Sequence, residues 1–178
     1  PRLYGYELMM APYIIAHMKI GLKLSEINVR LGQPDYQFQY KSRAHIYLTN
    51  SLEPPSDKGQ QSIAGLFPAL AHEAEAVNVV KAKKRFMVII GNPPYSGHSA
   101  NFGEWITKLV DDYYFVDGSP LGEKNPKWLQ DDYVKFIRLG QWLISQSKFG
   151  IMGYITNHSF IDNPTFPGMR QSFSKTFK

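Results

Sequence analysis

The sequence contains no cysteine among its 178 residues. Disulfide bonds, thiolate metal ligands and a cysteine nucleophile are therefore excluded within this chain. Long hydrophobic runs are also absent. The longest, Leu8 to Ala16, has nine residues and includes Pro12, whereas about 20 apolar residues are needed to cross a bilayer. We expect no membrane-spanning segment.

The five histidines are dispersed along the chain, at positions 17, 45, 72, 98 and 158. Their spacing does not match a set of metal ligands, so no metal site is predicted. The net charge of +5 permits binding to a polyanion such as nucleic acid but does not establish it. The densest basic cluster, Lys81 to Arg85, is expected to end a helix, where cations oppose the negative end of the helix dipole. Charge alone does not decide the function.

Apolar periodicity predicts that strands and helices alternate along the chain. Strands are expected at residues 3–7, 44–48, 86–90 and 150–155, and helices at 12–21, 69–82, 129–144 and from Pro167 onward. The third and fourth strands are continuous apolar runs of the kind buried in parallel sheets. The first helix should bury one stripe, formed by Ile14, Ile15, Met18 and Leu22. This order predicts an α/β fold with a parallel sheet, and we interpret the polar stretch at 96–127 as an insertion.

Polar and aromatic residues follow each predicted strand. They are Glu7 after the first, Asn50 and Ser51 after the second, Asn92 to Tyr95 after the third, and Asn157 to Ser159 after the fourth. Ligands of open α/β sheets bind beyond the carboxyl ends of the strands, so these residues form a candidate binding site. A carboxylate at the position of Glu7 can accept hydrogen bonds from both hydroxyls of a nucleotide ribose. An exposed strand-end carboxylate without a ligand explains Glu7 alone equally well.

Asn92-Pro93-Pro94-Tyr95 is the most informative segment. Two prolines fix the backbone and remove two N–H donors, so the local surface offers only acceptors, the Asn92 side-chain oxygen and the Pro93 carbonyl. Two acceptors suit the two hydrogens of an amino group and favour a pyramidal nitrogen whose lone pair is free to attack. Tyr95 could stack on the ring that bears this amine. The alternative is that the Pro-Pro pair only ends the strand.

With the apolar strand before it, this segment resembles motif IV of the amino methyltransferases that use S-adenosylmethionine, especially the N6-adenine DNA methyltransferases. Tyr4 to Glu7 resembles motif II, whose acidic residue binds the cofactor ribose. Residues 48–52 resemble motif III and imply that Asn50 and Ser51 bind the cofactor, although Asn50 stands where the family usually has aspartate. The resemblance implies a Rossmann-like doubly wound, mostly parallel sheet with S-adenosylmethionine as cofactor.

Residues 150–173 resemble motif VI and the start of motif VIII. In the family, an aromatic residue ahead of the last helix sandwiches the flipped adenine against the motif IV tyrosine, which implies this role for Phe166 opposite Tyr95. A hydrophobic staple at the helix start is the alternative for Phe166. The absence of cysteine argues against C5-cytosine methylation. N4-cytosine remains open because its amine poses the same chemical problem.

The segments at 92–99, 122–129 and 155–160 look more like the methyltransferase part of large single-polypeptide restriction-modification enzymes, which resemble type I systems. This implies a cytoplasmic enzyme that acts on double-stranded DNA, with nuclease, helicase and target-recognition parts in the same polypeptide. A glutamine methyltransferase of release factors and a non-catalytic module with a methyltransferase fold are the alternatives. Phe166 and the insertion favour DNA over glutamine, and the intact Asn92 to Tyr95 segment favours catalysis.

No glycine-rich motif I precedes Glu7, although in this family that loop holds the methionine part of the cofactor. We therefore expect residues 1–178 to form a partial catalytic domain, with motif I and the target-recognition domain outside it and with the sheet in two halves. The isolated 178-residue chain is predicted to be poorly stable and inactive. Methyl transfer to DNA by the purified chain alone, measured with labelled S-adenosylmethionine, would contradict this prediction.

Overall fold

The computed structural model describes residues 3–32, 43–55, 68–95, 97, 99–122 and 126–177. The chain divides into two compact units. The first comprises residues 1–51 and 55–83, and the second comprises residues 52–54 and 84–178. Both units combine helices with short parallel strands, so the predicted α/β class is confirmed. None of the described helices is both long and apolar enough to cross a membrane.

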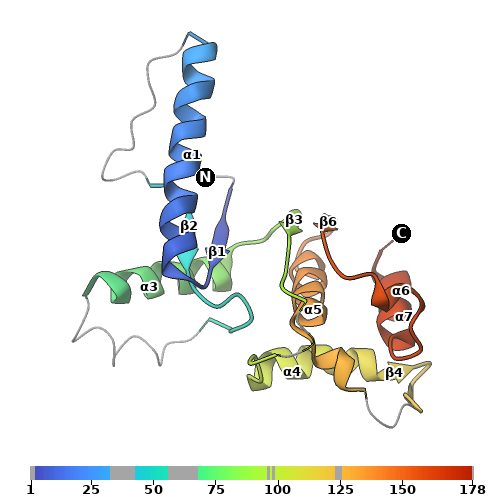
Figure 1. Ribbon diagram of the computed structural model, residues 1–178. Coiled ribbons are helices and arrows are strands. Elements are labelled where there is room, and N and C mark those ends of the chain that lie inside the picture. The colour runs from blue at the N-terminus through green and yellow to red at the C-terminus, as the bar shows by residue number, and fades with distance from the viewer. Residues whose placement is uncertain are drawn as a thin grey trace. The chain divides into compact units, whose positions relative to one another are not determined.

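The first unit is built on two parallel strands, β1 (Gly5–Glu7) and β2 (Ile46–Leu48), which lie where the sequence predicts them. Helix α1 (Met10–Arg30) follows β1, and helix α3 (Pro68–Lys83) packs against β2. Because the two strands run in the same direction, their carboxyl ends lie side by side (Figure 1).

Helix α1 is longer than predicted. It continues to Arg30 rather than ending near Gly21. Residues 22–30 include several good helix formers, and Glu26 pairs with both Lys23 and Arg30 across one turn of the helix. The helix ends before Gly32, whose φ of 63° is unfavourable for other residues. These local interactions outweigh the cost of placing Gly21 inside the helix, which is about 1 kcal/mol relative to alanine.

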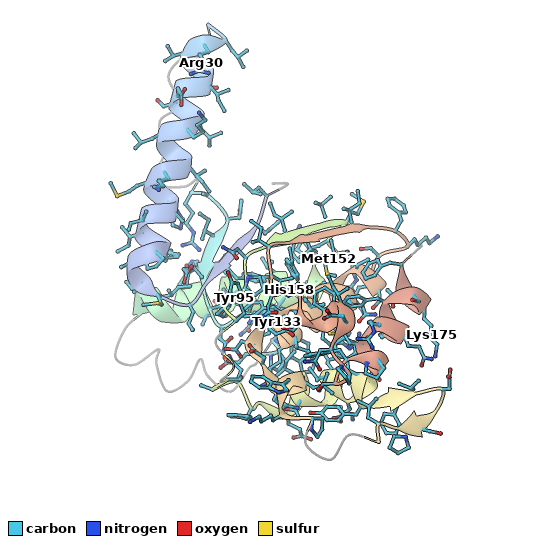
Figure 2. All side chains as sticks on the ribbon, turned by 45° about the vertical axis from the view of Figure 1, so that its right-hand side comes forward. Arg30, Tyr95, Tyr133, Met152, His158 and Lys175 are labelled. Atoms are coloured by element: carbon cyan, nitrogen blue, oxygen red, sulfur yellow. The ribbon has the colours of Figure 1, made fainter. Side chains whose placement is uncertain are left out.

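The prediction that α1 buries an apolar stripe is wrong. Ile14, Ile15, Met18 and Leu22 are 49%, 50%, 62% and 70% exposed. The helix contacts β2 instead through His17, whose Nε2 lies 3.3 Å from the Ile46 carbonyl oxygen. The C-terminal half of α1 extends past both strands, and its side chains stand out from the helix as far as Arg30 (Figures 1 and 2). An apolar stripe indicates a surface that can be covered but does not identify what covers it.

The second unit is built on another parallel pair, β3 (Val88–Gly91) and β6 (Ile151–Tyr154). Helix α5 (Asp132–Ser145), expected at 129–144, packs on one face of the pair. The contact is close because a Cβ added at Gly140 would lie 2.6 Å from the Met152 sulfur and 2.9 Å from the Tyr154 hydroxyl. Helices α6 (Ser159–Asp162) and α7 (Pro167–Thr176) follow β6, and Pro167 begins α7 as predicted.

The prediction that β3 and β6 are buried is wrong for one face of the pair. Val88, Ile90 and Ile151 are 63%, 78% and 69% exposed, while Met152 and Tyr154 pack against the core. A continuous apolar run favours cover on both faces, but among the described residues only the α5 face is covered. The parallel pairs form separate two-stranded sheets, so the expected division into two halves is present. A single doubly wound sheet is not present among the described strands.

The stretch at 96–127 contains regular structure that the sequence interpretation missed. Helix α4 (Glu104–Val110) buries Ile106 and Val110, whose four-residue spacing was the available signal. A short hairpin follows, formed by β4 (Phe115–Val116) and β5 (Ser119–Pro120). The core of the second unit, in which Tyr133 lies (Figure 2), draws on this stretch as well as on α5 and α7. It consists of Val110, Tyr113, Leu129, Tyr133, Val134, Ile137, Phe166 and Met169.

Candidate active site

The carboxyl ends of β1 and β2 bring the predicted cofactor-binding residues to one edge of the first unit. Glu7 ends β1, and its carbonyl accepts a hydrogen bond from the Thr49 N–H at 2.8 Å, just beyond the end of β2. Asn50 and Ser51 follow directly. The Glu7 carboxylate accepts the Met9 N–H at 2.9 Å through Oε1. The three residues are close in space as predicted, and their role in cofactor binding stays a prediction.

Side chains of α3 hold the end of β2, and sequence reasoning missed them. Glu73 is 9% exposed, accepts the Leu48 N–H at 3.1 Å and pairs with Arg43 at 2.6 Å. The Lys81 ammonium donates to the Asn50 carbonyl at 2.7 Å. These contacts fix the backbone that carries Asn50. The available signal was a glutamate at helical spacing from the valines at 77 and 80, on the face of α3 that is buried.

Replacing Glu73 by alanine should destabilise the end of β2 by about 1–3 kcal/mol, because the Leu48 N–H loses its acceptor. Glu73→Gln keeps an acceptor and should cost less. Glu75→Ala changes an exposed residue of the same helix and should stay within about 0.5 kcal/mol of the unchanged protein. Hydrogen exchange at the β2 amides measures the three effects. Equal exchange in Glu73→Ala and Glu75→Ala would show that Glu73 does not hold the end of β2.

In the second unit, β3 delivers Asn92-Pro93-Pro94-Tyr95 to the carboxyl end of the parallel pair. The last rung of the ladder is the hydrogen bond from the Ile155 N–H to the Gly91 carbonyl, at 3.0 Å. Pro93 is buried, whereas Asn92, Pro94 and Tyr95 are exposed. Within the described part of the chain, the Asn92 and Tyr95 side chains have no hydrogen bond, ion pair or ring contact. The segment therefore presents an amide and an aromatic ring at the edge where α/β sheets bind ligands.

The chain beyond Tyr95 is attached to the first turn of α5. Asp131, the N-cap residue of α5, is 5% exposed and accepts the Gly97 N–H at 2.8 Å through Oδ2. Its Oδ1 faces the Tyr133 N–H at 3.4 Å. Gly97 has a φ of 73°, a conformation that favours glycine. One carboxylate thus caps the helix and holds the loop that follows Tyr95.

Two further side chains of α5 hold the same loop. Asp132 Oδ1 accepts hydrogen bonds from the Ser99 hydroxyl at 2.6 Å and from the Asn101 side-chain amide at 2.9 Å. Lys135 has no exposed surface, and its ammonium donates to Ser99 Oγ at 2.8 Å and to the Asn101 carbonyl at 2.6 Å. Burial lowers the pKa of Lys135, and the carboxylates of Asp132 and Asp131 oppose that change.

Sequence reasoning missed these three residues, although signals for them were present. Asp131 and Asp132 stand at the start of a helical pattern, where aspartate favours the N-cap. Lys135 lies one helical turn after Asp131 and one before Leu139, at the edge of the apolar face of the helix. A charge at such a position indicates a buried partner.

Phe166 lies at the N-cap of α7 and is 1% exposed. Its ring centroid is 6.4 Å from that of Tyr133, in the core of the second unit. A base could contact the face of this ring only after neighbouring side chains move. The predicted stacking of an adenine between Phe166 and Tyr95 stays a prediction.

The predicted site residues fall into two groups. Glu7, Asn50 and Ser51 belong to the first unit, and Phe166 belongs to the second together with Asn92, Pro93, Pro94 and Tyr95. In the part of the chain that the structure describes, no group of three histidine, aspartate or glutamate side chains could hold a metal ion.

An α/β chain that presents Asn-Pro-Pro-Tyr at the carboxyl end of a parallel strand has the features of a methylase. Comparison with known families is more specific. Residues 2–178 match the family described as Eco57I restriction-modification methylase, and the chain belongs to that family. No curated protein matches it.

Solved structures similar to this chain belong to much longer proteins. The ATP-dependent Type ISP restriction-modification enzyme LlaBIII bound to DNA is 27% identical with a TM-score of 0.72, and the match covers 96% of this chain and 11% of that one. The DrdV–DNA complex is 28% identical with a TM-score of 0.68, over 99% of this chain and 16% of that one. A nuclease-deletion mutant of the Type ISP enzyme LlaGI is 22% identical with a TM-score of 0.68, and the match covers 14% of that chain. At this identity the likeness supports the fold alone.

Proposed function

We propose that this chain is the methyltransferase part of a restriction-modification enzyme that transfers a methyl group from S-adenosylmethionine to N6 of a flipped adenine in double-stranded DNA. The exposed Asn92-Pro93-Pro94-Tyr95 segment at the end of β3 carries the proposal. Membership of the restriction-modification methylase family supports DNA as the substrate rather than a protein glutamine.

The Asn92 side-chain oxygen and the Pro93 carbonyl, which we call the acceptor wall, explain how an unreactive amine becomes a nucleophile. The lone pair of an exocyclic amine is delocalised into the base. Asn92 Oδ1 and the Pro93 carbonyl would accept the two N6 hydrogens and stabilise the pyramidal nitrogen of the transition state. The Asn92 side chain has no competing partner among the described residues. Tyr95, 53% exposed, is available to stack on the extruded base, and Phe166 is proposed for its other face.

The first unit has suitable groups for the cofactor. S-adenosylmethionine, when bound, supplies an electrophilic methyl group. The Glu7 carboxylate uses Oε1 for the Met9 N–H, and no described residue bonds to Oε2, which leaves an acceptor for ribose hydroxyls. Asn50 and Ser51 emerge beside it from β2, where they would contact the cofactor adenine. Transfer is direct to nitrogen, so no covalent enzyme intermediate is required.

The proposal includes a larger architecture. We propose that the two parallel pairs belong to one Rossmann-like doubly wound sheet, joined by the strand that carries the glycine-rich loop. The described parallel sheets have two strands each, and this supports the proposal because the edge of a strand pair can hydrogen-bond to a further strand. The small share of the similar structures that this chain covers supports further parts in the same cytoplasmic polypeptide, namely nuclease, helicase and target-recognition parts.

The test is transfer of tritium-labelled methyl groups from S-adenosylmethionine to mixed plasmid DNA by the full-length protein, with the products resolved as nucleosides. Label in N6-methyladenine is the expected result. Label in N4-methylcytosine would correct the base, and label in protein would favour the glutamine methyltransferase. Cofactor binding without any transfer would indicate a non-catalytic module.

A further inference from the structure

The position of Tyr95 depends on the backbone on either side of it. Its side chain makes no hydrogen bond, ion pair or ring contact with the described residues, yet a stacking residue must be placed accurately. On one side, the ladder ends at Gly91, and the prolines at 93 and 94 fix φ. On the other side, the first described anchor is Gly97, only two residues beyond Tyr95.

We propose that Lys135, with Asp131 and Asp132, is a positioning residue that sets the place of Tyr95 by holding Gly97, Ser99 and Asn101 in the loop that follows it. The inference rests on the proposed function for its effect on methyl transfer. The anchoring itself is a property of the structure alone.

The three side chains hold alternate residues of the loop. Asp131 binds the Gly97 N–H, and Ser99 and Asn101 both bind Asp132 and Lys135. The Ser99 hydroxyl donates to Asp132 and accepts from Lys135 and from the Asn101 N–H at 3.0 Å. A hydroxyl has one donor and two acceptor sites, so all of its hydrogen-bonding capacity is used.

Stability of α5 does not explain a fully buried lysine. Exchanging buried charged groups for well-packed apolar residues is often neutral or stabilising. Lys135 lies one helical turn after Asp131 and Asp132, whose carboxylates bind the same loop, so the three charged groups lie together at the start of α5. What Lys135 adds is a directional hold on two loop positions, with its ammonium 4.7 Å from the centre of the Phe102 ring. The interactions of this charge are directed at the loop that follows the acceptor wall.

Lys135→Met in the full-length protein should keep the stem of the side chain and lose its charge and donors. We expect kcat for DNA methylation to fall about 100-fold, the effect of a misplacement of about 1 Å, with S-adenosylmethionine affinity unchanged. Ser99→Ala, which alters the loop side of the contact, should act in the same direction but less strongly. The matched control is Lys108→Met, at an exposed position of α4, and it should leave kcat unchanged.

A double variant separates positioning from general damage. If Lys135 acts through Tyr95, then Lys135→Met combined with Tyr95→Ala should be no slower than Tyr95→Ala alone. If the fall in kcat of the double variant equalled the product of the two single-variant falls, the inference would be overturned and the proposed function would remain intact.

Hydrogen exchange gives a readout that does not depend on activity. Amides at 97–102 should exchange at least 10-fold faster in Lys135→Met, whereas amides of β3 and β6 should not change. Unchanged exchange at 97–102 would overturn the inference. If the unmodified protein methylates no DNA, the proposed function fails and this measurement alone decides the anchoring.

Discussion

Replacing Asn92 by alanine is expected to lower methyl transfer to DNA by about 100- to 1000-fold, the range measured when one stabilising group is removed from a preorganised site. The substitution removes one of the two acceptors that would hold the N6 hydrogens. The Pro93 carbonyl remains, so the base should still bind, and the loss should appear in kcat rather than in the affinity for DNA. Initial rates at saturating DNA and S-adenosylmethionine measure it.

The surroundings of Asn92 allow this test to separate a loss of activity from a loss of stability. The side chain is exposed and forms no hydrogen bond or ion pair with another described residue, so its removal should leave the unfolding midpoint unchanged. Asn28→Ala, on the long helix of the first unit, is the matched control and should keep full activity. If Asn92→Ala kept more than about a tenth of the activity, the acceptor wall would not be what activates the amine.

The strand end that carries Asn92 to Tyr95 was predictable because it depends on consecutive residues. An apolar strand followed by Asn-Pro-Pro-Tyr specifies a strand end, a rigid backbone and two acceptors without knowledge of the fold. The clustering of Glu7, Asn50 and Ser51 was predictable for a related reason. Parallel strands bring their carboxyl ends to one edge, whatever lies between them.

Burial was not predictable to the same degree. The periodicity of Ile14 to Leu22 shows which face of a helix is apolar, but cover depends on a partner that the same residues do not specify. The exposed faces of β3 and β6 show the same limit. Sequence reasoning predicted which surfaces can be buried, and the structure shows which of them are buried within the described residues.

Long-range polar contacts were the hardest to predict. Lys135 and Ser99 are separated by 36 residues, and Glu73 and Leu48 by 25 residues. No local pattern links these partners. A charged residue on an apolar helical face indicates that a partner exists but does not say which residue it is. For this reason the groups that position the site were found only in three dimensions.

Gly168→Ala is expected to give the largest loss of stability among single-methyl changes in the second unit. Gly168 lies in the first turn of α7, where a Cβ would overlap the Tyr113 carbonyl oxygen and lie 2.7 Å from the Phe115 carbonyl oxygen. These atoms are backbone, so no rotamer change can relieve the overlap, and α7 would have to move away from residues 113–115. Overpacking of a core costs about 1–3 kcal/mol and sometimes more, and a fixed backbone obstacle favours the upper end of that range.

The expected consequence is a local opening of α7. If the substitution destabilises α7 by about 3 kcal/mol, the amides of this helix should exchange roughly 100-fold faster with solvent, since each 1.4 kcal/mol corresponds to a factor of ten. Gly122→Ala is the matched control because nothing lies within 4 Å of its added Cβ, and α7 exchange should then be unchanged. Similar exchange in the two variants would show that α7 does not need the close backbone contact. Because Phe166 occupies the N-cap position of this helix, an opened α7 should also expose its ring, so Gly168→Ala would reveal whether the predicted stacking residue can leave the core.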